Sequence, residues 1–138
     1  MRYLGLDLGS RTLGIAISDA SGIIASSYKT INHNEEYDKL IDDLEEIINE
    51  KKIDKIVLGF PKNMDNSIGE KGNLSIKFKE KLEKKYNIEV ILQDERLTTK
   101  QAEAVLIKGD TSRKKRKKVI DSLAATIILQ SYLDKKGR

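Results

Sequence analysis

The 138-residue chain carries 26 lysines and arginines against 22 acidic residues, and it contains no cysteine. This length fits one domain with a buried core, and the lack of cysteine excludes disulfides, zinc–thiolate sites and thiol catalysis. No run approaches the ~20 apolar residues of a membrane span, and no basic-then-apolar signal pattern opens the chain. We therefore expect a single cytoplasmic domain, residues 1–138, with no membrane partner.

The chain begins with two short apolar runs, at 3–8 and 13–18, separated by Gly9-Ser10-Arg11-Thr12. Turn formers between β-type runs predict a β-hairpin. Asp7 lies inside the first run. Because burying an unpaired carboxylate is costly, Asp7 should have a cation, a metal or a hydrogen-bonding shell. Residues 23–31 predict a third strand that completes a meander.

Helices and strands alternate after the meander. Apolar residues spaced three and four apart predict helices over about 34–51, 67–86, 98–109 and 119–133. A capping box formed by Ser67 and Glu70 is expected to open the second of these helices. Nearly continuous apolar runs predict strands at 54–60 and 88–92. His33, the only histidine, falls in a loop and is expected to be an ordinary surface residue.

These elements predict an α/β fold with a five-stranded mixed sheet, an antiparallel meander plus parallel strands, flanked by helices. Right-handed crossovers bring the carboxyl ends of strands one, four and five to one edge, where sites form in open sheets. Asp7 lies near that edge, and Glu95 follows strand five. Asp121 lies in the last helix, which could pack across both.

Taken singly, Glu95 fits an acid in a surface turn. Asp121 fits an acid in the first turns of a helix, where it interacts favourably with the helix dipole. Taken together with Asp7, they could converge, and converging carboxylates select Mg²⁺ or Mn²⁺. A pair of such ions serves phosphodiester hydrolysis. The six consecutive cations at 113–118 are typical of nucleic-acid-binding arms, although such runs also occur in disordered loops. The combination indicates a nuclease.

Four ordered blocks then carry a resemblance to a known family. LGLDLGSRTLGIAISD at 4–19, IVLGFPKNMDNSIGEKG at 56–72, QDERLTT at 93–99 and KKVIDSLAATIIL at 117–129 resemble the YqgF, or RuvX-like, proteins, described as Holliday junction resolvases and as pre-16S ribosomal RNA nucleases. The resemblance implies an RNase H-like fold and a catalytic, metal-binding triad of Asp7, Glu95 and Asp121. It also implies Mg²⁺ or Mn²⁺, two ions, with Asp7 holding both.

Cations near the proposed edge are candidate contacts to substrate phosphates. In the motif loops these are Arg11, Lys62 and Arg96, and solvated surface cations are the alternative interpretation. The basic run is expected to guide the nucleic-acid backbone without reading bases. Its members are Arg113, Lys114, Lys115, Arg116, Lys117 and Lys118.

The function that we expect is metal-dependent hydrolysis of phosphodiesters in the 16S ribosomal RNA precursor, in ribosome biogenesis. The main alternative is a Holliday junction resolvase for branched DNA, which tends to require a dimer; no dimer surface is legible and the oligomeric state stays open. A non-catalytic RNA-binding ribosome-assembly factor is a further alternative. A phosphotransferase of the actin-like type would need two such domains, and 138 residues supply one.

Overall fold

The computed structural model describes residues 1–61, 68–94 and 113–137, with the backbone alone described over 113–121. The strands are β1 (Tyr3–Leu8), β2 (Thr12–Ser18), β3 (Ala25–Asn32), β4 (Lys55–Phe60) and β5 (Val90–Asp94). The helices are α1 (Tyr37–Asp43), α2 (Glu45–Glu50), α3 (Glu70–Tyr86) and α5 (Arg113–Lys136). No described helix is both long and apolar enough to cross a membrane.

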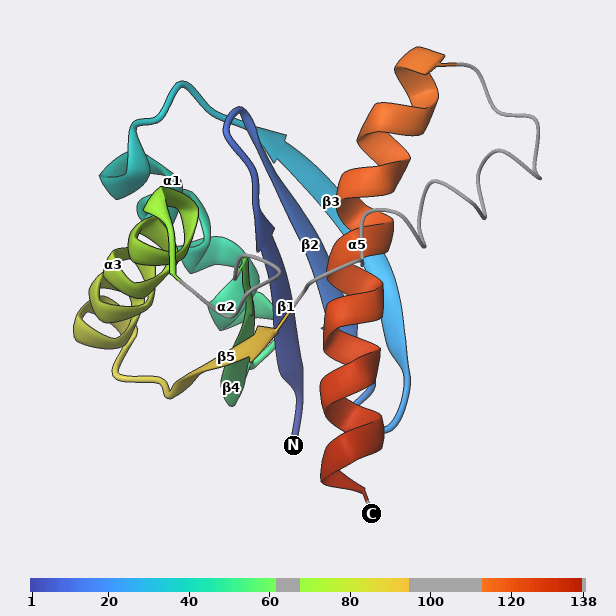
Figure 1. The fold of residues 1–138 in the computed structure, drawn as a ribbon. Helices are drawn as coiled ribbons and strands as arrows, with labels where there is room; N and C mark the ends of the chain where they lie inside the picture. Colours follow the sequence, from blue (N-terminus) through green and yellow to red (C-terminus); the bar gives the residue numbers. More distant parts are fainter. Residues whose placement is uncertain (62–67, 95–112, 138) are drawn as a thin grey trace.

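The five strands form one mixed sheet in the order β3-β2-β1-β4-β5. β1 pairs antiparallel with β2 and parallel with β4, β2 pairs antiparallel with β3, and β4 pairs parallel with β5. Helices α1, α2 and α3 cover one face and α5 covers the other (Figure 1). The expected α/β fold, with a meander extended by parallel strands, is confirmed.

Alternation along β1 assigns its side chains to the two faces. Leu4 and Leu6 belong to the larger core beneath α1–α3, whereas Tyr3 belongs to a smaller core beneath α5. At Gly5 the helix and the strand approach closely, since a Cβ there would lie 2.7 Å from the Leu129 Cβ. The central strand is therefore held between two layers, and α5 is fitted tightly against it.

Two expected helices begin or divide elsewhere than predicted. The helix expected over 34–51 begins at Tyr37, because Glu35 adopts a left-handed backbone with φ of 64°. It divides at Leu44, whose N–H donates to the Ile41 carbonyl three residues back at 3.2 Å. The predicted capping box is wrong, because Gly69 is the N-cap residue of α3 and no side chain caps it.

The other boundaries shift for local reasons. The third strand begins at Ala25 because the N–H groups of Ile23 and Ile24 bond to the Asp19 carboxylate instead. The fifth strand runs over 90–94, two residues later than expected. The last helix begins at Arg113, so the basic run belongs to it; lysine and arginine are good helix formers. The helix expected over 98–109 lies outside the described residues.

Candidate metal centre at the carboxyl edge of the sheet

Asp7 is the penultimate residue of the central strand and is half-buried. It pairs with Gly14 of β2. On the other side, Leu6 pairs with Leu58 of β4, so that Gly59 is the next residue in register with Asp7. Neither neighbour has a side chain on the face that Asp7 shares with α5. The sequence thus flanks this carboxylate with two glycines, and metal ligation needs such room beside the oxygen atoms.

Helix α5 runs antiparallel to β1 across that same face. The ring of Tyr3 lies 5.8 Å from that of Tyr132, and Gly5 lies against Leu129 and the Ala125 carbonyl. Two strand residues advance about 6.6 Å and one turn of four helical residues about 6 Å. Position 121 lies one such turn before Ala125, on the same stripe of α5. This spacing predicts that position 121 is level with Asp7.

The end of β5 contributes to the same edge. Asp94, its last residue, pairs with Phe60 of β4 and is exposed. β5 lies two strands from β1, which corresponds to about 9.6 Å at the usual spacing. Residue 95 follows immediately.

The described residues contain only part of the predicted site. Asp7 and Arg11 are described with their side chains, whereas Asp121 and the basic run are described as helical backbone alone. Glu95, Lys62 and Arg96 lie outside the described residues. Among the side chains that are described, no three acidic or histidine residues gather as a metal site. Convergence of the triad therefore stays a prediction.

The turn after Asp7 is held by a histidine whose role the sequence did not reveal. The Gly9 N–H donates to the Thr12 carbonyl at 2.8 Å, which closes the turn. His33 Nδ1 accepts the N–H of Glu35 at 3.1 Å, so Nε2 carries the proton and donates to the Gly9 carbonyl at 2.9 Å. His33 is half-buried, and the expectation of an ordinary surface histidine is wrong.

The pairing of β3 explains how His33 reaches the turn. After a register shift between Ile15 and Ala16, β3 stays in register with β2 from Lys29 to the pair Asn32 and Thr12, and the His33 N–H then donates to the Arg11 carbonyl at 2.8 Å. This fixes the backbone of Arg11 while its side chain is exposed at the edge. We call these two hydrogen bonds, from His33 Nε2 to Gly9 and from the His33 N–H to Arg11, the His33 clamp. Finding it requires the register of β3 on β2, which the sequence alone does not supply.

The donor set at this edge suits a hard divalent cation. Carboxylate oxygens favour Mg²⁺ and Mn²⁺, and Asp7 is both partly withdrawn from water and flanked by glycine. An exposed arginine lies on the adjoining turn, where an anionic substrate would approach. Asp7 thus offers one carboxylate of the kind that such a cation prefers, and Arg11 offers a cation on the turn that follows it.

Comparison with known proteins gives one family match and two similar relatives. A family model described as "RuvX: Holliday junction resolvase" matches residues 1–135. The chain is 56% identical to a Bacillus subtilis protein named "Putative pre-16S rRNA nuclease", over 97% of this chain and 98% of the relative. A relative of the same name from Caldanaerobacter subterraneus is 55% identical, over 97% and 96%.

A solved structure of Thermus thermophilus RuvC in complex with a Holliday junction substrate has the same fold. The TM-score is 0.61 at 14% identity, and the match covers 99% of this chain and 96% of that one. At this identity the likeness concerns the arrangement of the elements. It agrees with the expected RNase H-like architecture.

Proposed function

This chain belongs to the RuvX family, and from that membership we propose that it is a metal-dependent nuclease acting on the 16S ribosomal RNA precursor. The observation that carries the proposal is the name shared by relatives 50–56% identical over almost the whole chain. The placement of Asp7 at the carboxyl edge supports it. Such a nuclease would work in the bacterial cytoplasm.

In this proposal Asp7, Glu95 and Asp121 hold one or two Mg²⁺ or Mn²⁺ ions, and Asp7 ligates both ions where two bind. The bound metal would activate water and neutralise charge on the phosphodiester. The chain's own part is to orient the substrate. Rigid β1 fixes Asp7, the His33 clamp fixes the adjoining turn, and Arg11 at that turn is a proposed contact to a substrate phosphate, with Lys62 and Arg96 as further candidates.

The basic run completes the proposed substrate surface. Residues 113–118 form the first turns of α5, the helix whose later residues pack under Asp7's strand. Six cations on a helix that leads to the site would contact the phosphate backbone without reading base sequence.

The experiment that tests the activity compares Asp7→Asn with Asp43→Asn. Asp43 is an exposed acid at the end of α1, on the opposite face of the sheet, so it matches the charge change without the site. We expect Asp7→Asn to lose Mg²⁺- or Mn²⁺-dependent cleavage of precursor ribosomal RNA while its circular dichroism is unchanged. Full cleavage by Asp7→Asn would refute the role assigned to Asp7, whereas RNA binding without any cleavage by the unaltered chain would favour a non-catalytic RNA-binding factor.

A Holliday junction resolvase is the second candidate, because the family description names that activity and the RuvC fold is shared. A side-by-side assay on a four-way DNA junction and on precursor ribosomal RNA separates the two. We expect faster cleavage of the RNA. Symmetric incision of the junction with no RNA cleavage would reverse the assignment.

Neutralising residues 113–118 tests the basic run independently. A protein with 6–10 phosphate contacts loses roughly 10³–10⁵ in affinity between 50 and 200 mM salt. We expect the neutral variant to bind RNA more weakly and with a flatter salt dependence. An unaltered salt dependence of RNA binding would mean that residues 113–118 do not contact the phosphate backbone of the RNA.

A further inference from the structure

A cavity of about 530 Å³ opens at the same edge as Asp7, on the other face of the sheet. It lies between the β1–β2 turn, the start of α1 and the first two turns of α3. Leu8, which follows Asp7 directly, is part of its wall, because successive strand residues point to opposite faces. Its volume is in the range of pockets that hold small ligands. The proposed metal centre makes no use of it.

One wall of the cavity is aromatic and fixed in place. The Tyr37 ring packs edge-on against Phe78, with centroids 6.4 Å apart, and lies 5.6 Å from the His33 ring. Burial and then the Glu35 charge raise the pKa of Tyr37, so the phenol remains a neutral donor. Leu74 adds an aliphatic surface. A flat, apolar molecule with polar edges fits such walls.

The charges at the rim are balanced. Lys71 and Lys77 are exposed and, among the described residues, make no ion pair, although three other lysines of α3 do. Glu35 and Glu70 line the same cavity. Two cations beside two anions do not concentrate a polyphosphate. They suit one phosphodiester together with a base whose amino group donates to a carboxylate.

We propose that this cavity holds one unpaired nucleotide of the substrate strand, next to the nucleotide that is cut. Its base stacks against Tyr37, its amino group faces the rim carboxylates, and its phosphate meets Lys71 and Lys77. Recognition of RNA by proteins commonly uses unstacked bases on aromatic side chains in this manner. The inference rests on the proposed nuclease function and names its substrate class, a strand that is single-stranded beside the cut.

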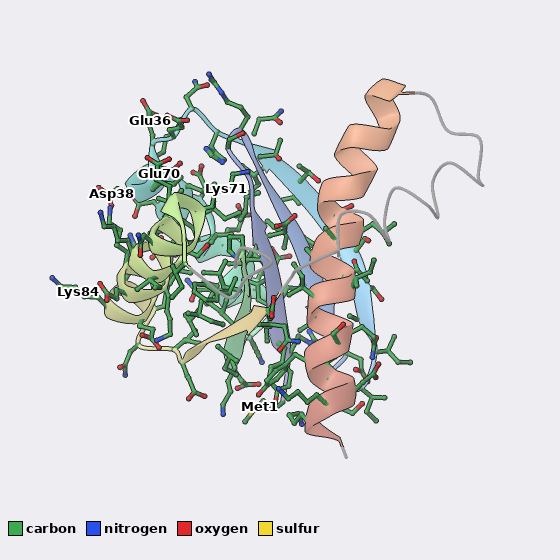
Figure 2. All side chains as sticks on the ribbon, in the orientation of Figure 1. Met1, Glu36, Asp38, Glu70, Lys71 and Lys84 are labelled. Carbon is green, nitrogen blue, oxygen red and sulfur yellow. The ribbon has the colours of Figure 1, made fainter. Side chains whose placement is uncertain are left out.

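Helix α3 carries exposed lysines at both of its ends, so one far from the cavity can serve as a matched control (Figure 2). Glu70 and Lys71 lie at the end of the helix near the β1–β2 turn, and Lys84 lies at the far end. Lys84 is exposed and outside the cavity. Lys84→Gln therefore removes one charge from the same helix without touching the proposed site.

The test is to bind mononucleotides to the protein in the absence of metal. Changes in amide chemical shifts, measured by nuclear magnetic resonance, report the binding. Cytidine and uridine 5′-monophosphate are two of the probes, because cytidine carries an amino group where uridine carries a carbonyl oxygen. Inorganic phosphate is the third probe. We expect cytidine monophosphate to shift the amides of 8–10 and 71–77 and to bind more tightly than uridine monophosphate. Stacking of one base corresponds to roughly 5- to 150-fold in affinity.

Three variants locate the binding. Lys71→Gln with Lys77→Gln should weaken nucleotide binding and raise KM for RNA cleavage with little change in kcat, whereas Lys84→Gln should leave both unaltered. Tyr37→Leu keeps an apolar side chain and should lose the preference for nucleotide over phosphate. The surface lysine variants keep the test valid should Tyr37→Leu fold poorly.

The opposing outcomes are distinct. Identical shifts with inorganic phosphate alone, or equal binding of the two nucleotides, would overturn the inference. So would an absence of shifts in a protein that still cleaves RNA. Failure of the proposed function would appear differently, as no metal-dependent cleavage of either nucleic acid by the unaltered chain.

Discussion

The two faces of the sheet are packed by different means. Beneath α1–α3, large aliphatic side chains fill the space, and Leu6, Ile15 and Leu58 are wholly buried. Beneath α5, small residues let the helix approach, with Gly5 against Leu129 and Ala16 beside Gly5 in the sheet. Asp7 belongs to the second face. The difference teaches that apolar burial is concentrated on the α1–α3 side of the sheet, whereas small residues on the α5 side leave room beside the Asp7 carboxylate.

The aliphatic face should show the largest loss of stability. Leu6→Ala removes a side chain that is 0% exposed at the centre of the sheet, and such truncations cost about 2–5 kcal/mol. Urea denaturation measures the change in free energy of unfolding. Ile24→Ala, at a side chain that is 61% exposed, is the control and should stay within about 0.5 kcal/mol. Equal losses would mean that this face is not the main core.

On the α5 face, adding a side-chain atom should lower the free energy of unfolding. Gly5→Ala places a Cβ 2.7 Å from the Leu129 Cβ, and overpacking of this kind costs about 1–3 kcal/mol. In a Leu129→Gly background the same change should cost less, because the opposing Cβ is gone, and a double-mutant cycle measures this coupling. Gly137→Ala, whose nearest contact is 3.4 Å, is the control. Additive effects would argue against the close approach.

Alkaline pH should weaken the α1–α3 face through one tyrosine. The Tyr86 hydroxyl donates to the Ile41 carbonyl, and burial, followed by Glu45 and Asp42, raises the pKa of Tyr86 from 10.0 to about 12. The phenol of Tyr86 therefore ionises at lower pH in the unfolded chain than in the folded one. Its contribution to the free energy of unfolding is complete below pH 10 and is lost as pH rises from 10 to 12. Urea midpoints over that range measure it. Tyr86→Phe should flatten the slope, and the exposed control Tyr28→Phe should not.

The smallest expected effect concerns the polar contacts of α5. Thr126 donates its hydroxyl to the Ser122 carbonyl at 2.8 Å and lies 2.8 Å from the Ser27 hydroxyl of β3. Thr126→Val keeps the shape and removes these bonds, which should cost about 0.5–1.5 kcal/mol. Thr126→Ser keeps the hydroxyl and should cost less. A larger loss with Ser than with Val would show that the methyl group matters more than the bonds.

The sequence predicted the sheet because its signals are local. The apolar runs at 3–8 and 54–60 can be recognised without knowledge of their partners, and Asp7 is conspicuous among apolar neighbours. The start of α5 was not predictable, since a run of lysine and arginine is compatible with both loop and helix. The His33 clamp and the glycines that flank Asp7 depend on strand register, which residues distant in sequence determine together.

The length of α5 has a consequence at the edge of the sheet. Its 24 residues extend about 36 Å, whereas the six residues of β1 extend about 20 Å, and the C-terminal turns of the helix lie beside the start of the strand. The N-terminal turns therefore overhang the carboxyl edge (Figure 1). The first turn of α5 has no acid, and the run of cations there opposes the helix dipole by about 0.3–1 kcal/mol per charge. A bound phosphate backbone would reverse the sign of this term, so that substrate binding and the helicity of the overhang reinforce each other.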